Sequence, residues 1–146
     1  MARNFALFNA LNTASHENLW VTDGTVLGTF ELTGINGAPT TSLIPNDLTP
    51  FNGEFLFNGN DTSGHAGLWV SNGTSTGTFE LTGINGVSTN GLRPQDLTVF
   101  NGEALFDGAD TAGNFGLWVT DGTVLGTFEL TGINGASTNG ASRACG

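Results

Sequence analysis

The sequence predicts an all-β protein made of β-propeller-like blades, each of four antiparallel strands, and three observations lead to this fold class. Trp20, Trp69 and Trp118 lie 49 residues apart and the copies around them align without a gap, so the chain holds three 49-residue repeats. Each repeat contains short apolar runs bounded by Gly, Asn or Asp, as β-strands usually are. Helical spacing is absent, and the 23 Gly residues would destabilise helices.

Four strands are expected in the complete repeat, and each is short and rich in β-branched or aromatic residues. Asn52-Gly53 separates the first two, and an Asn-Gly pair between apolar runs predicts a β-hairpin because both positions tolerate positive φ. A polar connection precedes the third strand, and a Gly-containing turn precedes the fourth. The predicted strands cover residues 47–51, 54–57, 68–70 and 78–84.

The predicted sheets carry apolar side chains on both faces. The runs "FALF" (residues 5–8), "EFLF" (54–57), "EALF" (103–106) and "LWV" (68–70) do not alternate between apolar and polar residues. Such runs are typical of sheets that are covered on both sides. A propeller blade between two neighbours meets this condition. A β-sandwich leaves one face of each sheet to solvent, and a β-solenoid usually has a shorter coil, so both fit less well.

The three repeats are not equally complete, which predicts eleven strands and an unfinished assembly. The first repeat (1–45) lacks its first strand, the second is residues 46–94, the third is 95–140, and residues 141–146 form a tail. Three blades cannot close a ring, since propellers have roughly 4–8. Exposed apolar end faces therefore predict completion by other copies of the chain or by a longer parent chain. Two copies would give a six-bladed ring, and an open head-to-tail filament is the alternative.

Composition excludes several classes of partner. The formal net charge is −10, with 13 acidic residues, three Arg and no Lys, so the surface would repel nucleic acid and anionic lipid. No apolar run is long enough to span a membrane, and membrane insertion is not expected. The single Cys145 can form no internal disulfide. The first twenty residues lack the apolar region of a signal peptide, so export would need a signal outside this chain.

Candidate ligand-binding residues occur at matching positions of the repeats. Trp20, Trp69 and Trp118 could stack on sugar rings, although their Leu and Val neighbours favour a place in the core. His16 and His65 align with Asn114, and a loop His that can be replaced by Asn fits a surface polar residue as well as a ligand contact. These six residues are the candidate ligand-binding set.

A calcium-type metal site is a second candidate, in the connection between the second and third strands. The side-chain oxygens there are of the kind that hard cations prefer, but the first repeat offers no matching carboxylate. The candidate ligands are Asn58, Asn60, Asp61, Asp107 and Asp110. In the "DGT" turns, Asp23 and Asp121 are replaced by Asn72, which favours turn formation over metal binding.

No catalytic residue is predicted, and no cofactor beyond the calcium candidate. The carboxylates Glu31, Glu80 and Glu129 recur identically in the repeats and are interpreted as solvated or hydrogen-bonded edge residues. An enzyme usually breaks the symmetry of its repeats to build one site, and these repeats differ little. The sequence therefore predicts a protein that is not an enzyme.

The string "GLWVTDGTVLGTFEL" (residues 116–130), preceded by "DLTVFNGEALFDGADTAGN", resembles the bacterial ELWxxDGT-type tandem repeat. The resemblance extends from residue 5 to about residue 140. This chain departs from the pattern at Asn18, Gly67 and Gly116, where the family favours Glu, and at Asn72, where it favours Asp. The resemblance implies a repetitive, propeller-like β architecture and extracellular deployment, and it implies no catalytic residue.

These observations together predict a non-enzymatic structural or adhesive module of an extracellular or cell-surface bacterial protein. The module would assemble with copies of itself through its blade faces, into a closed propeller or a fibre. The alternative is a carbohydrate-binding propeller lectin with one glycan site per repeat.

Overall fold

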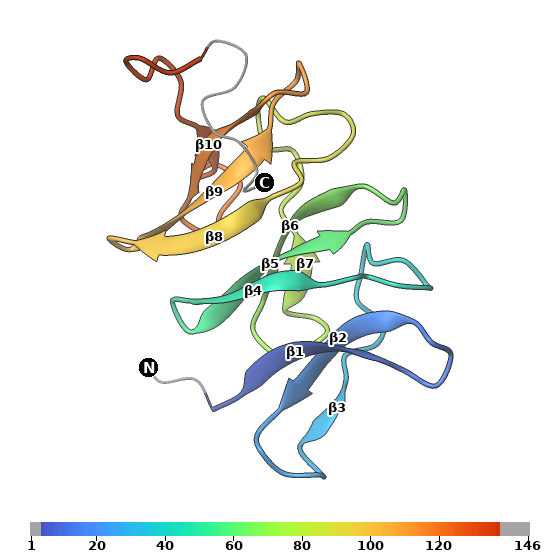
Figure 1. Ribbon diagram of the computed structural model, residues 1–146. Helices are drawn as coiled ribbons and strands as arrows, with labels where there is room; N and C mark the ends of the chain where they lie inside the picture. The colour runs from blue at the N-terminus through green and yellow to red at the C-terminus, as the bar shows by residue number, and fades with distance from the viewer. Residues whose placement is uncertain (1–3, 138–146) are drawn as a thin grey trace.

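The computed structural model describes residues 4–137, which form eleven strands in three antiparallel sheets and contain no helix (Figure 1). Within each sheet the strands lie side by side in chain order. Sheet 1 contains β1 (Ala6–Leu11), β2 (Glu17–Thr22) and β3 (Thr29–Glu31). Sheet 2 contains β4 (Asn46–Phe51), β5 (Glu54–Asn60), β6 (Ala66–Ser71) and β7 (Thr78–Glu80). Sheet 3 contains β8 (Gln95–Phe100), β9 (Glu103–Ala109), β10 (Phe115–Thr120) and β11 (Phe128–Glu129).

The all-β class and the eleven strands are confirmed in the described part of the chain, and none of its sheets closes on itself. The second and third strands are longer than predicted, because the polar connection is a tight hairpin in which the Asp61 N–H donates to His65 O. The fourth strand was predicted to reach residue 84 but ends at Glu80. Its continuation turns away, and Gly83 has a φ of 75°.

The Asn-Gly hairpins form as predicted. Asn52 and Gly53 have φ values of 50° and 82°, and Asn101 and Gly102 have 55° and 82°. Positive φ at both central residues matches the twist of the flanking strands, which joins β4 to β5 and β8 to β9 with a two-residue loop. These turns fix the register of the two four-stranded sheets.

An irregularity that the sequence did not predict occurs at the start of β4 and β8. Asp47 and Asp96 adopt positive φ, 55° and 59°, and the register shifts at each of them. The hydroxyl of Thr49 donates to Asp47 O at 2.9 Å, and Thr98 donates to Asp96 O at 3.1 Å. The Asp-Leu-Thr segment therefore has one built-in conformation in both repeats.

Each sheet has two apolar faces of different composition. We define the Trp face as the one with the aromatic pair Phe8/Trp20 in sheet 1, Phe57/Trp69 in sheet 2 and Phe106/Trp118 in sheet 3. The opposite face, here called the Leu face, carries Leu7, Leu19, Val21 and Leu32 in sheet 1, and Leu56, Leu68, Val70 and Leu81 in sheet 2. The corresponding residues of sheet 3 are Leu105, Leu117, Val119 and Leu130.

The hydrophobic cores lie between sheets. One core joins the Leu face of sheet 1 to the Trp face of sheet 2, and the other joins the Leu face of sheet 2 to the Trp face of sheet 3. Figure 1 shows the sheets in this order, from blue through green to orange. The middle sheet is consequently buried on both faces, as the pattern of its two central strands shows.

Sheets 2 and 3 lie closest together at their first strands. β4 packs against β8, whereas no comparable packing joins the last described strands, β3, β7 and β11. The Leu97 N–H donates to the Asp47 carboxylate at 2.7 Å, which ties the two first strands together. Sheets 2 and 3 therefore meet along their first strands.

Sheet 1 is incomplete along one edge. β5 and β9 are each paired on both sides, but within residues 4–137 β1 is paired only with β2. Within this described range no strand equivalent to β4 or β8 pairs with β1, and no carboxylate of sheet 1 accepts the Leu48 N–H in the way that Asp47 accepts the Leu97 N–H. The described part of the chain also has no helix that could cross a membrane.

We expect a first strand added to sheet 1 to stabilise the fold. Residues 1–4 would be replaced by Pro-Asn-Asp-Leu-Thr-Pro-Phe-Asn-Gly, which copies residues 45–53 and places its Gly directly before Phe5. Pairing of the added strand with β1 and a hydrogen bond from the Leu48 N–H to the added Asp should raise the free energy of unfolding by about 1 kcal/mol. Urea denaturation measures the change.

The control is the same extension with Ala in place of its Asp. Equal urea midpoints for the two extended chains would contradict strand addition, because the chains differ only in the residue that should accept the Leu48 N–H.

Candidate functional site

Two polar pockets occupy matching places beside the connections that follow β3 and β7. The first has a volume of about 360 Å³ and the second about 230 Å³. Each is lined by the last residue of a short strand, Glu31 or Glu80, and by a residue of the hairpin loop in the same sheet, Asn12 or Asp61. The repeat therefore places a Glu carboxylate at the same point in both pockets.

In the first pocket the carboxylate of Glu31 is held by two amides. Asn18 Nδ2 donates to Glu31 Oε1 at 2.8 Å, and Asn12 Nδ2 donates to the same oxygen at 3.1 Å. Asn18 Oδ1 in turn accepts the Leu43 N–H at 2.9 Å, so Asn18 links the pocket to the connection that follows. The negative charge of Glu31 is thus compensated by neutral donors.

In the second pocket both Asn residues are replaced. Asp61 stands where Asn12 does, and Gly67 stands where Asn18 does. The Glu80 carboxylate lies in the space that the Asn side chain would fill, because a Cβ on Gly67 would collide with it. Burial raises the pKa of Glu80 to about 7, and the negative charge of Asp61 contributes to the rise.

The third repeat has the same replacements as the second. Asp110 and Gly116 accompany Glu129, and a Cβ on Gly116 would collide with the Glu129 carboxylate. Burial, followed by the charge of Asp110, raises the pKa of Glu129. Sequence reasoning interpreted these Glu residues as edge residues and missed their burial, although the paired change from Asn-Asn to Asp-Gly across the repeats was a visible signal.

These pockets have room for a small polar group. Among residues 4–137 there is no group of three or more His, Cys, Asp or Glu side chains that could share a metal ion. Because burial raises the pKa of Glu80 to about 7, the charge of the second pocket changes near neutral pH.

The five candidate calcium ligands are spread over different structural roles. Asn58 Nδ2 donates to Pro94 O at 2.7 Å, and Asn60 ends β5. Asp61 Oδ1 accepts the backbone N–H groups of Ser63 and His65, and Asp110 Oδ1 accepts those of Ala112 and Asn114. Burial and then the charge of Asp96 raise the pKa of Asp107. The structure thus uses Asp61 and Asp110 to shape their hairpin loops.

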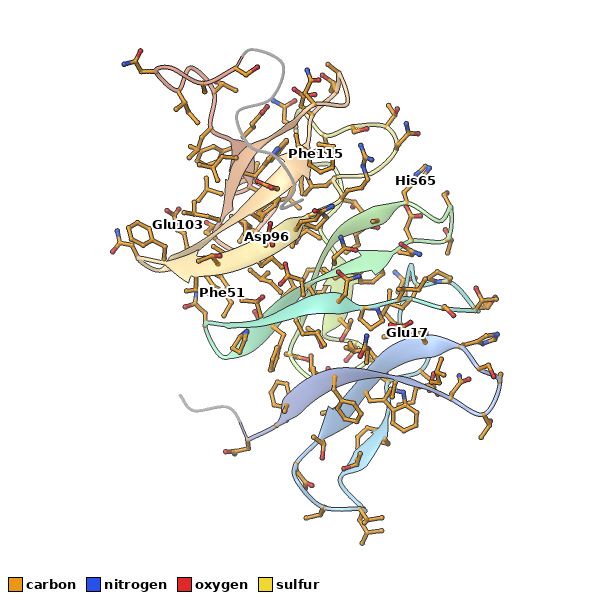
Figure 2. The ribbon with its side chains drawn as sticks, in the orientation of Figure 1. Glu17, Phe51, His65, Asp96, Glu103 and Phe115 are labelled. Atoms are coloured by element: carbon orange, nitrogen blue, oxygen red, sulfur yellow. The ribbon has the colours of Figure 1, made fainter. Side chains whose placement is uncertain are left out.

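The candidates His16, His65 and Asn114 lie at the ends of these same loops. Figure 2 shows His65 at the loop end of sheet 2. His65 also lines the second pocket, and its backbone N–H, like that of His16 and Asn114, donates to the loop Asp or Asn four residues earlier. The common role of this position is in the turn, where His and Asn both fit.

Two of the three Trp residues are core residues of the stacked sheets. Trp69 and Trp118 are 0% exposed, and Trp20 is partly exposed because no sheet of residues 4–137 covers the Trp face of sheet 1. Each indole N–H donates to a backbone carbonyl of the neighbouring strand, Ala10, Gly59 or Gly108, at 2.9–3.1 Å. Two of the three rings therefore present no surface on which a sugar could stack.

The "DGT" turns have the structural role that the exchange of Asp and Asn suggested. Asp23 Oδ1 accepts the N–H and the hydroxyl of Thr25, and Asn72 Oδ1 accepts the same groups of Thr74. The hydrogen bonds from Thr25 hold the pKa of Asp23 below its usual value. A carboxylate and an amide oxygen serve equally, which confirms the turn interpretation.

Equivalent residues of the three sheets differ in solvent exposure at the two end faces of the stack. Leu105, Leu117 and Leu130 on the Leu face of sheet 3 are partly exposed, whereas their counterparts in sheets 1 and 2 are buried. Ile133 is 41% exposed and the equivalent Ile84 is 9% exposed. Both ends of the described stack thus present residues that the repeat buries elsewhere.

No family model, curated protein or solved structure matches this chain. The resemblance to the ELWxxDGT-type repeat therefore stays a prediction from the quoted residues. The candidate site rests on the geometry of the repeats alone.

We expect Glu80→Gln to stabilise the protein at alkaline pH. The folded state binds the Glu80 proton up to about pH 7, whereas the unfolded chain releases it near 4.5, so stability from this group falls as pH rises between these values. Above pH 7 the Gln variant should gain about 1 kcal/mol, a value reduced for solvent screening at a half-buried site. Urea denaturation at pH 5 and pH 8 measures it.

Glu31→Gln is the matched control, because in repeat 1 the amides of Asn12 and Asn18 need the carboxylate as their acceptor. It should lose about 1 kcal/mol at pH 8. The same response from both variants would contradict the difference between the pockets.

The burial of the Trp residues predicts unequal costs of truncation. Trp69→Ala should lower the free energy of unfolding by about 4 kcal/mol, because it opens a cavity between sheets 1 and 2. Trp20→Ala should cost about half as much, since one side of that ring faces solvent. Urea denaturation of dilute protein compares them, and equal losses would show that Trp20 is as fully packed as Trp69.

Proposed function

We propose that this protein is a non-enzymatic structural module that assembles with copies of itself through the two end faces of its sheet stack. The observation that carries the proposal is that the same repeat positions are buried between sheets and exposed at the ends, as Ile84 and Ile133 are. Apolar surface that the repeat normally covers favours association, because its removal from water lowers the free energy.

The proposed arrangement is propeller-like, with the first strands towards the centre. It is supported by the contact of β4 with β8 and by the absence of comparable packing among the last described strands. Two copies would supply six sheets to a ring, and continued stacking would give a fibre. Adhesive or scaffolding work outside a bacterial cell follows from the resemblance to the ELWxxDGT-type repeat and belongs to the same proposal.

A lectin with one Trp site per repeat is not favoured by the geometry. Trp69 and Trp118 are enclosed between sheets, and the remaining Trp20 is on the end face that the proposal assigns to self-association. The proposal therefore assigns Trp20 to self-association and not to glycan binding.

Self-association is tested by analytical ultracentrifugation over a range of concentrations. The chain has a mass of 15.0 kDa, and we expect species of twice that mass or more, with stronger association as salt increases. Salt should act in this direction because each copy carries a net charge of −10 and salt screens the repulsion. A monomer at every concentration and salt level would contradict the proposal.

Leu125→Ser is the control variant for this experiment. Leu125 is 97% exposed although sheet 2 covers the Trp face of sheet 3, and its counterpart Leu27 is 96% exposed although sheet 2 covers the Leu face of sheet 1. A neighbouring sheet on either face therefore leaves this position uncovered. Its replacement should leave association unchanged.

A further inference from the structure

A phenyl ring packs over the glycine of the "DGT"-type turn at both sheet-to-sheet contacts. The ring of Phe5 in sheet 1 lies over Gly73 of sheet 2, so near that a Cβ on Gly73 would be 2.8 Å from Phe5 Cε2. The ring of Phe51 in sheet 2 lies over Gly122 of sheet 3, where a Cβ would be 3.4 Å from Phe51 Cε2. Figure 2 shows Phe51 between the first strands of sheets 2 and 3.

The residue two positions after that glycine also contacts the preceding sheet. In sheet 2 it is Ser75, whose hydroxyl donates to Thr33 O at 2.6 Å. In sheet 3 it is Val124, which packs against the core cluster that contains Phe51. The turn after the third strand is therefore a docking element for the sheet before it.

Sheet 1 has the same turn, and nothing from residues 4–137 is docked on it. No atom of these residues lies within 4 Å of a Cβ placed on Gly24, and Val26, which corresponds to Ser75 and Val124, is 92% exposed. A hollow of about 410 Å³ is present at this turn, and its lining residues are Thr22, Gly24, Thr25, Val26 and Thr29. We call this feature the Gly24 hollow.

The matching ring is free at the other end of the stack. Phe100 ends β8 as Phe51 ends β4, yet Phe100 is 65% exposed where Phe51 is 5% exposed. It lies on the sheet whose Leu face is open, where Leu117 and Ile133 are also exposed to solvent. Each copy therefore has one unused ring and one unused hollow.

We propose that Phe100 of one copy occupies the Gly24 hollow of a second copy, so that the Leu face of sheet 3 covers the Trp face of sheet 1. This inference rests on the proposed self-association and adds its partner surfaces and its direction. The contact is heterologous, because ring and hollow are on different sheets of each copy. It repeats between two copies the ring-over-glycine contact that Phe5 and Phe51 make within the chain.

A symmetric contact between two Leu faces lacks this support. It would bring the Phe100 rings of two copies together and would leave both Gly24 hollows empty. The head-to-tail contact places the Phe100 ring of one copy in the Gly24 hollow of the next, so it is the arrangement that the repeat favours.

The test uses two variants that each remove one side of the junction. Phe100→Asp removes the ring, and Val26→Asp places a charge at the hollow. Both positions are exposed, so both variants should remain folded, which circular dichroism verifies. Alone, each variant should be monomeric by analytical ultracentrifugation.

Mixed in equal amounts, the two variants should form a dimer of about 30 kDa and nothing larger. The Val26→Asp copy still has its ring and the Phe100→Asp copy still has its hollow, so one intact junction remains for each pair. Fluorescence should shift to the blue on mixing, because Trp20 is the one Trp of the described chain that is partly exposed and it lies on the covered face.

Leu27→Asp is the matched control for Val26→Asp, since Leu27 is on the same turn and its equivalent Leu125 stays exposed although sheet 2 covers the Trp face of sheet 3. It should associate like the unmodified chain. The inference is overturned if the unmodified chain associates but the mixture stays monomeric, or if either Asp variant associates as strongly as the unmodified chain. A monomeric unmodified chain would overturn the proposed function itself.

Discussion

The packing of one sheet's Trp face on the Leu face of the sheet before it is the contact on which the whole structure depends. None of the sheets has a core of its own, since each core cluster combines residues of two sheets. Trp69 and Trp118 are the largest buried side chains at these contacts, and each is tied to its own sheet by an indole hydrogen bond. The stack is stable only as a set of neighbours, as in other repeat proteins.

Because the two faces differ, this contact has a direction. A Trp face requires a Leu face, so a stack of any number of such sheets ends in one of each. The described chain accordingly has an aromatic end at Phe8 and Trp20 and an aliphatic end at Leu105 and Leu117. The uncovered faces at the two ends follow from the same pairing of a Trp face with a Leu face that stabilises sheet 2.

Much of the fold could be predicted from spacing and turn chemistry. The 49-residue interval between Trp residues and the Asn52-Gly53 pair gave the repeat and the hairpins, since both depend on local sequence. The positive φ of Asp47 and Asp96 could not be predicted, because residues other than Gly seldom adopt this conformation. The raised pKa of Glu80 was missed as well, because it depends on burial beside the connection that follows β7, and that burial is set by the folded chain.

Differences between the repeats show which contacts are interior. Gly59 and Gly108 have no room for a Cβ, because a Leu of the neighbouring connection, Leu43 or Leu92, and the indole ring of their own sheet are within 3.2 Å of it. Sheet 1 has Ala10 at this position, on the face that no sheet covers within the described chain. A methyl group there takes part of the space that the Leu side chain fills elsewhere. A junction between two copies would therefore keep the ring-over-glycine contact of the interior and differ from it at this connection, so it would be a weaker version of the internal contact.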